Sequence, residues 1–270
     1  MSELMRESSK QTQAVTPSPV HAHHLHVGRR WWGFGTLLLA LLALLAAARC
    51  AITMVYLGFH FSNVVNPITQ PASYYVFVDG GAAQFTSAAV ALALGTLAVL
   101  FGMVWAGAHL AGKPMVLFSV WAACLLLAAI FPTDNSPDIT SFAGWVHQFA
   151  GGGILLFLSI AGFTAARRLT ESPDWRPVVP TVRILSVGAA ILAGAYVASR
   201  IVQVVPDAMV LFGGEDIGGI LQRVAFGFDI AVVTALAVHL VRVSWLRLSD
   251  RTEPWTGGDP ANPPTAHLGS

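Results

Sequence analysis

The chain has 270 residues, of which 55% are hydrophobic and only 11% are charged, whereas soluble domains carry about 25% charged residues. This composition excludes a water-soluble globular enzyme, and the formal net charge of +1 excludes a basic surface for nucleic acid. The two cysteines, Cys50 and Cys124, lie within apolar runs, which excludes a disulfide framework. An integral membrane protein remains, with membrane lipids as its expected partners.

Six apolar runs are long enough, or nearly so, to cross a bilayer as helices. A helix that spans the hydrocarbon core needs about 20 mainly apolar residues. The runs lie at about 33–57, 84–106, 115–131, 146–166, 182–204 and 219–241. They lack the alternation of apolar and polar residues that barrel strands show. The sequence therefore predicts an all-α fold, a polytopic transmembrane bundle of six helices.

Both ends of the chain are polar and rich in residues that favour irregular structure. We expect disordered tails at 1–30 and 249–270, on either side of a membrane domain at 31–248. The first tail contains four histidines that could bind a divalent metal weakly, although a flexible tail is the favoured interpretation: His21, His23, His24 and His26.

The basic residues predict how the helices are oriented. Of the 15 Lys and Arg residues, 12 lie in the two tails, in the loops after the second and fourth helices, or at the adjoining helix ends. The other three loops, at about 58–83, 132–145 and 205–218, contain none and carry acidic residues instead. Because cytoplasmic loops retain Lys and Arg, we expect a multi-pass protein of the plasma membrane with both termini in the cytoplasm.

Polar side chains inside the membrane are costly and tend to mark function. Four ionisable ones fall within the runs: Arg49, Arg200, Arg223 and Asp229. The rise of 1.5 Å per residue places the three arginines in the outer half and Asp229 near mid-membrane. Further polar residues share their helix faces or begin a neighbouring helix: Tyr56, His60, Gln84, Tyr196, Gln203 and Gln222. This pattern predicts a polar pocket that opens outward.

Two interpretations of this pocket remain open. Three guanidiniums outnumber the one carboxylate at membrane depth, and their planar shape suits phosphate or carboxylate. This favours a non-enzymatic protein that binds an anionic lipid or amphiphile through these ten residues, as a sensor, carrier or accessory subunit. In the structural alternative, Arg200 and Arg223 pair with Asp134 and Asp229, and Arg49 extends to the outer interface.

A box of residues at the end of the third helix carries a family resemblance. Ile130-Phe131-Pro132-Thr133-Asp134 is followed by His147, Arg200 and the pair Gln222-Arg223. Over residues 33–245 the chain resembles the bacterial domain-of-unknown-function family 998. The resemblance implies a multi-helix membrane protein without an assigned activity, and it draws attention to Asp134, His147, Arg200 and Arg223.

Two further functions are weighed against lipid binding. Asp134 could orient His147 for acid–base catalysis in an intramembrane hydrolase, and with His60 they could just supply the three ligands of a catalytic zinc. The same pair could equally fix a loop. A small-solute transporter would depend on Asp229 to relay protons. The sequence assigns no cofactor and no oligomeric state, and the small residues Gly95, Gly102, Gly151, Gly152, Gly153, Ala190, Gly194 and Ala198 are expected to serve helix packing.

Overall fold

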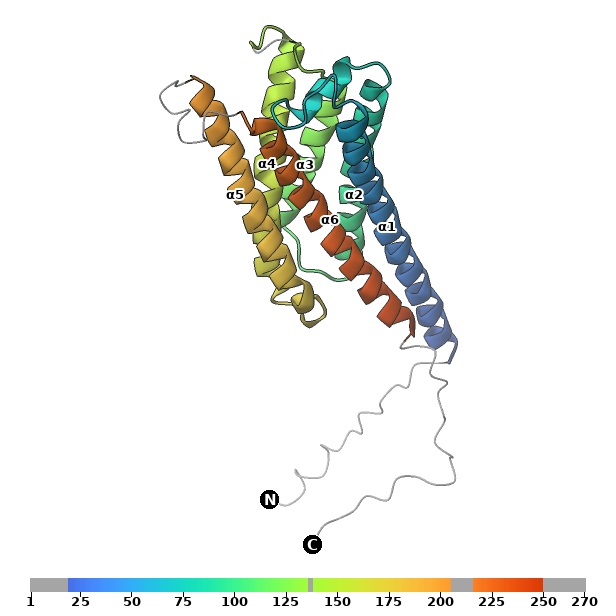
Figure 1. The fold of residues 1–270 in the computed structure, drawn as a ribbon. Helices are drawn as coiled ribbons and strands as arrows, with labels where there is room; N and C mark the ends of the chain where they lie inside the picture. Colours follow the sequence, from blue (N-terminus) through green and yellow to red (C-terminus); the bar gives the residue numbers. More distant parts are fainter. Residues whose placement is uncertain (1–18, 136–137, 205–215, 250–270) are drawn as a thin grey trace, which may run out of the picture.

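The computed structural model describes residues 19–135, 138–204 and 216–249, and the side chains of these except 19–32 and 201–204. Within these ranges the chain is entirely helical and contains no strand (Figure 1). The six long helices are α1 (Pro19–His60), α2 (Gly81–Trp105), α3 (Lys113–Ile130), α4 (Phe142–Leu169), α5 (Val179–Val204) and α6 (Gly218–Ser249). Two short 3-10 helices, η1 (Ala72–Phe77) and η2 (Pro173–Val178), lie in the connections.

The six long helices confirm the predicted transmembrane bundle, because each has the length and apolar composition to cross a membrane. The protein is an integral membrane protein. The helix α1 begins at Pro19, so residues 19–30 of the expected disordered tail are helical. The side chains of the four tail histidines lie outside the described part, as does the second tail beyond residue 249.

The helices pack in chain order and the last returns to the first. Each contacts its successor, and α6 also contacts α1 along the side of the bundle. Figure 1 shows α6 crossing the bundle, beside α5 at one end and beside α1 at the other. We call the end with Gly33 and Leu248, which touch each other, the proximal end. The distal end is the one at which α1 ends and α6 begins.

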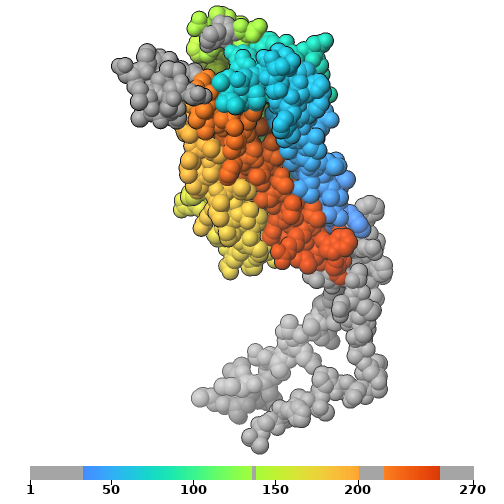
Figure 2. Space-filling model, in the orientation of Figure 1, coloured from blue at the N-terminus to red at the C-terminus, as the bar shows by residue number. Residues whose placement is uncertain are grey.

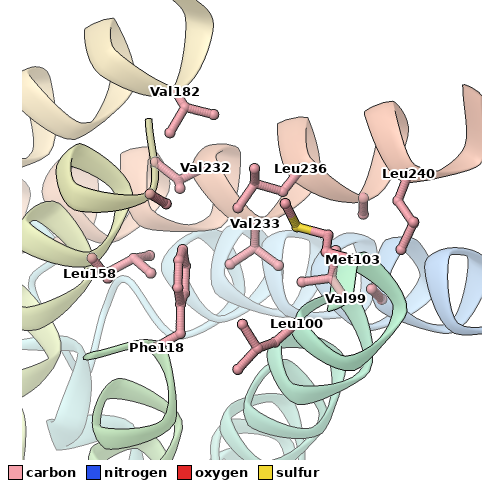
Figure 3. Close-up of a cluster of buried hydrophobic side chains, with 14 of the residues drawn as sticks. Val99, Leu100, Met103, Phe118, Leu158, Val182, Val232, Val233, Leu236 and Leu240 are labelled. Carbon is pink, nitrogen blue, oxygen red and sulfur yellow. The ribbon is translucent and has the colours of Figure 1, made fainter. Parts of the chain in front are cut away.

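Large apolar side chains fill the proximal half of the bundle (Figure 3). The helix α6 lies at the centre of this core, where Val232, Val233 and Leu236 are each at most 1% exposed. The other helices supply buried partners, among them Val99, Leu100, Met103, Phe118, Leu158 and Val182. Such close packing leaves little free volume, so room for a ligand has to be sought in the distal half.

Small residues bring α1 and α2 into close contact. A Cβ atom at Gly95 would lie 2.6 Å from Cβ of Ala46 and 3.4 Å from Cα of Ala43. Gly102 meets Leu240 of α6 and Leu39 of α1 in the same way. Without a hydrophobic driving force between helices in lipid, this approach of backbones supplies much of the association energy. Gly95 and Gly102 therefore serve packing, as expected.

We predict that Gly95→Ala destabilises the bundle. The added methyl group forces α1 and α2 apart, and overpacking of this kind costs about 1–3 kcal/mol. Gly227→Ala is the matched control, since its Cβ atom would meet no described atom within 4 Å. Thermal unfolding of the purified protein in one detergent should show a lower midpoint for Gly95→Ala only. Equal midpoints for both variants would contradict the close α1–α2 contact.

Candidate functional site

Two cavities hollow the distal half of the bundle. The first, which we call the central cavity, has a volume of about 430 Å³ and lies between α1, α2, α3, α4 and α6. The second, the α4–α5 groove, has a volume of about 1020 Å³ and lies between α4 and α5 beside the start of α6. They share a wall made of Ser73, His147, Gly151, Leu155 and Gln222.

The central cavity is mainly apolar and reaches the lipid-facing surface. Val55 and Phe59 of α1 line it and are 59% and 81% exposed. Gly227 of α6, opposite them, is exposed as well. The cavity therefore opens sideways between α1 and α6, and its polar lining includes His147, Gln222 and Arg223.

Glycines keep the α4–α5 groove open. A Cβ atom at Gly151, Gly152 or Gly194 would meet no described atom within 4 Å. The expectation that these three glycines serve helix packing is therefore wrong, because nothing packs on them. Of the three consecutive glycines, only Gly153 serves helix packing as expected. A Cβ atom at Gly153 would lie 2.6 Å from Sγ of Cys124 in α3. The groove floor continues along α4 to Ser159 and along α5 to Ala190.

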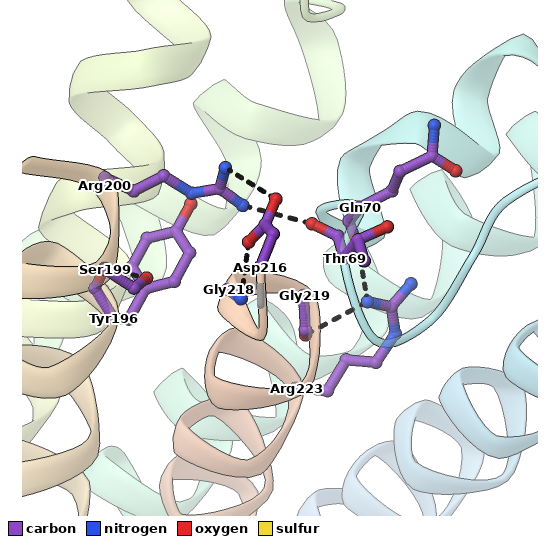
Figure 4. A network of polar contacts seen from close by, with 9 residues as sticks. All are labelled: Thr69, Gln70, Tyr196, Ser199, Arg200, Asp216, Gly218, Gly219 and Arg223. Atoms are coloured by element: carbon purple, nitrogen blue, oxygen red, sulfur yellow. Dashed lines mark hydrogen bonds and ion pairs between the residues drawn. The ribbon is translucent and has the colours of Figure 1, made fainter. Parts of the chain in front are cut away.

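Arg200 lies at the distal rim of the groove, where three elements meet (Figure 4). Its guanidinium forms an ion pair with Asp216 at 3.9 Å and donates a hydrogen bond to the carbonyl oxygen of Thr69 at 3.3 Å. It also lies 5.3 Å from the ring centroid of Tyr196, within range of a cation–π contact. The other carboxylate oxygen of Asp216 accepts a hydrogen bond from the amide of Gly218 at the start of α6.

Arg223 ties the connection between α1 and α2 to α6. Its guanidinium donates to the carbonyl oxygens of Pro67 at 2.9 Å, Gln70 at 2.6 Å and Gly219 at 3.0 Å, and to the hydroxyl of Tyr75 at 3.0 Å. Next to it, Oε1 of Gln222 accepts from the amide of Ala72. Figure 2 shows the connection lying over the first turns of α6. Arg223 therefore holds the α1–α2 connection in place over the start of α6.

Four of the predicted residues lie away from both cavities. Arg49 is exposed on α1 and donates to Oγ of Ser87 at 2.7 Å. His60 stacks on Tyr56 at 4.9 Å between ring centroids, and both are exposed, as is Gln84 on α2. The prediction of one pocket with three arginines is therefore wrong. The small residues Ala43, Ala47 and Cys50 face the interior of the bundle and turn Arg49 outward.

The other predicted residues are distributed around and below the cavities. Tyr196, Arg200 and Gln222 line the groove, and Gln222 and Arg223 line the central cavity. Asp229 is 1% exposed, lines neither cavity and has no hydrogen-bond partner among the described residues. The alternative in which it pairs with Arg223 is wrong, because the donors of Arg223 point to the loop carbonyls. The side chain of Gln203 lies outside the described residues.

Asp134 and His147 both line the groove, yet each bonds to the backbone nearby. Oδ2 of Asp134 accepts from the amides of Thr140 and Ser141, and hydrogen bonds from Ser141 and Thr140 hold the pKa of Asp134 below its ordinary value. Nδ1 of His147 lies 2.8 Å from the carbonyl oxygen of Phe131. Since a carbonyl oxygen only accepts, Nδ1 is the donor in this contact.

This geometry corresponds to the loop-fixing role of Asp134 and His147 rather than to an acid–base pair. No hydrogen bond joins them in the part of the chain that the structure describes. The three candidate zinc ligands are not brought together either, because His60 lies on the outer face of α1. Within that same part, no three His, Cys, Asp or Glu side chains are grouped to hold a metal ion.

Comparison with known proteins gives one match. The model of a family described as "Protein of unknown function (DUF998)" matches residues 44–239, which agrees with the resemblance seen in the sequence. No curated protein and no solved structure matches the chain. The family description names no activity.

We predict that Arg223→Met strongly destabilises the protein. The change leaves several carbonyl groups near the membrane without a donor, and each unsatisfied group costs about 1–3 kcal/mol. Arg49→Met removes one exposed hydrogen bond and should change stability by less than about 1 kcal/mol. Thermal unfolding in detergent compares the two. If Arg49→Met were the more damaging change, the anchoring role of Arg223 would be refuted.

Proposed function

We propose a lipid-binding function for this chain, which belongs to the protein family of unknown function DUF998. The binding site is the α4–α5 groove, which takes a single amphiphile with its head group at the rim and its hydrocarbon chain along the floor. The observation that carries the proposal is the open groove of about 1020 Å³ that changes from polar to apolar along its length.

The floor of the groove suits a hydrocarbon chain. It is lined by Leu155, Leu156 and Ile160 of α4 and by Ala190, Ala193 and Val197 of α5. From Arg200 at the rim to Ala190 the groove extends about 15 Å along α5, at a rise of 1.5 Å per residue. Leu156 and Val197 are exposed at its edges, so a chain can enter sideways from the bilayer.

The rim favours a head group with charges of both signs. Arg200 presents a guanidinium suited to phosphate or carboxylate, and the Asp216 carboxylate lies 3.9 Å from it. The groove also contains the carboxylates of Asp134 and Asp216, so the predicted surplus of positive charge is absent from the described lining. A zwitterionic phospholipid fits these groups better than a purely anionic one.

This function requires no chemistry, and it suits a sensor, a carrier or an accessory subunit. We further propose that the distal end faces away from the cytoplasm at the plasma membrane. The described basic residues at the proximal end support this orientation: Lys113, Arg167, Arg168, Arg176, Arg183, Arg242 and Arg247. The groove would then take its lipid from the outer leaflet.

The lipid proposal predicts that filling the groove removes a bound lipid. Native mass spectrometry of the protein released from mild detergent should show a phospholipid on the parent chain and much less on Gly194→Leu. Gly227→Leu, which fills open space in the central cavity instead, is the matched control. Arg200→Gln should weaken binding about tenfold, the effect of losing one charge-assisted hydrogen bond. Equal lipid on Gly194→Leu and the parent would refute the site.

The orientation predicts which sites a membrane-impermeant thiol reagent can reach in intact cells. In a background without Cys50 and Cys124, Asp79→Cys at the distal end should be labelled. Glu171→Cys at the proximal end should react only after the membrane is opened. The reverse pattern would contradict the proposed orientation and leave the groove itself unaffected.

A further inference from the structure

The helices α4, α5 and α6 pack in a fixed register beside the groove. Leu155, Ala193 and Ala225 form one buried cluster, with one residue from each helix. Two turns deeper, a Cβ atom at Gly162 would meet Ser186 of α5 and Val232 of α6. On each of the three helices, the residues of the two contacts are seven positions apart. Residues at matching positions between the contacts therefore lie at the same depth on all three helices.

A polar layer lies midway between these two contacts. Ser159 is four residues beyond Leu155 and three before Gly162, and Asp229 stands in the same relation to Ala225 and Val232. The residue of α5 at this level is Ala189. Ser159 is 5% exposed, while Ala189 and Asp229 are each 1% exposed. The register therefore places the Ser159 hydroxyl and the Asp229 carboxyl at one depth, where α5 contributes only the methyl group of Ala189.

Asp229 has no charged or hydrogen-bonding counterpart in the part of the chain that the structure describes. Neither of its carboxyl oxygens has a hydrogen-bond partner there, and the same holds for Oγ of Ser159 and Oγ of Ser186. An ionised carboxylate without a partner is very costly inside a membrane bundle, and such a group becomes neutral by taking up a proton.

The described ionisable groups of the surrounding helices lie at other depths of the bundle. The ionisable groups nearest in sequence on the three helices are His147 and Arg167 of α4, Arg183 and Arg200 of α5, and Arg223 and His239 of α6. On α1, which also packs against α6, Arg49 is exposed and bonded to Ser87. Arg200 and Arg223 bond to the α1–α2 connection at the distal end. A proton is thus the cation that this layer accommodates.

We propose that Asp229 is a proton-binding site in the interior of the bundle, at the depth of Ser159. Ser159 belongs both to the groove lining and to the polar layer that contains Asp229. The site goes beyond lipid binding, because it gives the bundle an interior group that can bind and release a proton.

The test uses dicyclohexylcarbodiimide, an apolar reagent that modifies carboxyl groups only in their protonated form. The full chain in detergent is treated over a pH series, and labelled peptides are located by mass spectrometry. We expect labelling at Asp229 that falls about tenfold from pH 6 to pH 10. Asp229→Asn should abolish it, while Asp79→Asn, a change of an exposed acid, should leave it intact. A water-soluble carbodiimide should label Asp79 and spare Asp229.

Ser159→Ala tests whether the hydroxyl group of Ser159 acts on Asp229. Loss of the hydroxyl dipole should shift the midpoint of Asp229 labelling to higher pH, whereas a purely structural role of Ser159 would leave the midpoint in place. Absence of labelling at every pH, in a sample that elutes as a single folded species, overturns the proposal. Protection by sodium chloride but not by choline chloride at constant pH also overturns it, since the site would then hold a metal cation.

These outcomes are independent of the proposed lipid function. Carbodiimide labelling needs no bound lipid, and Gly194→Leu should keep Asp229 labelled even where it loses the lipid. A chain that binds lipid without labelling, or labels without binding lipid, separates the two proposals.

Discussion

The distal half of this bundle depends on how backbone carbonyls outside helices are satisfied at the edge of a membrane. A bilayer tolerates irregular backbone only where protein groups supply the missing hydrogen bonds. Arg223 and Arg200 supply them to Pro67, Gln70 and Thr69, and the carbonyl of Ile68 accepts from the amide of Ile220 in the first turn of α6. The α1–α2 connection thereby rests on α6, where a Cβ atom at Gly219 would lie 2.5 Å from the carbonyl oxygen of Gln70.

The bundle is filled at its proximal end and hollow at its distal end. At the proximal end α6 packs directly on the large side chains of α2, α3 and α5. At the distal end the connection rests on α6, and the groove lies between α4 and α5 beside the start of that helix. Glycines then line free space, as Gly151, Gly152 and Gly194 do. The α4–α5 groove thus has a polar rim and an apolar floor. This combination supports an amphiphile as its occupant.

The sequence predicted the architecture well, because hydropathy and length determine which segments cross a bilayer. The site was predicted only in part. Arg200 and Gln222 do line a cavity, but helical periodicity could not tell which face of α1 is turned inward, and Arg49 was placed wrongly for that reason. Three of the four described acceptors of Arg223 are backbone carbonyls, of Pro67, Gln70 and Gly219, which no side-chain pattern reveals. Ser159 was missed because a single serine in an apolar run is usually bonded to its own helix.

The central claim is that a lipid lies in the α4–α5 groove. A structure of the full chain in a lipid nanodisc, determined by electron cryomicroscopy with a rigid antibody fragment bound, tests it most directly. The account predicts continuous elongated density that begins beside the Arg200 guanidinium and ends near Ser159. Density confined to the outer surfaces of α1 and α2, or an α5 packed flush against Gly151 and Gly152 with no space between, would contradict it.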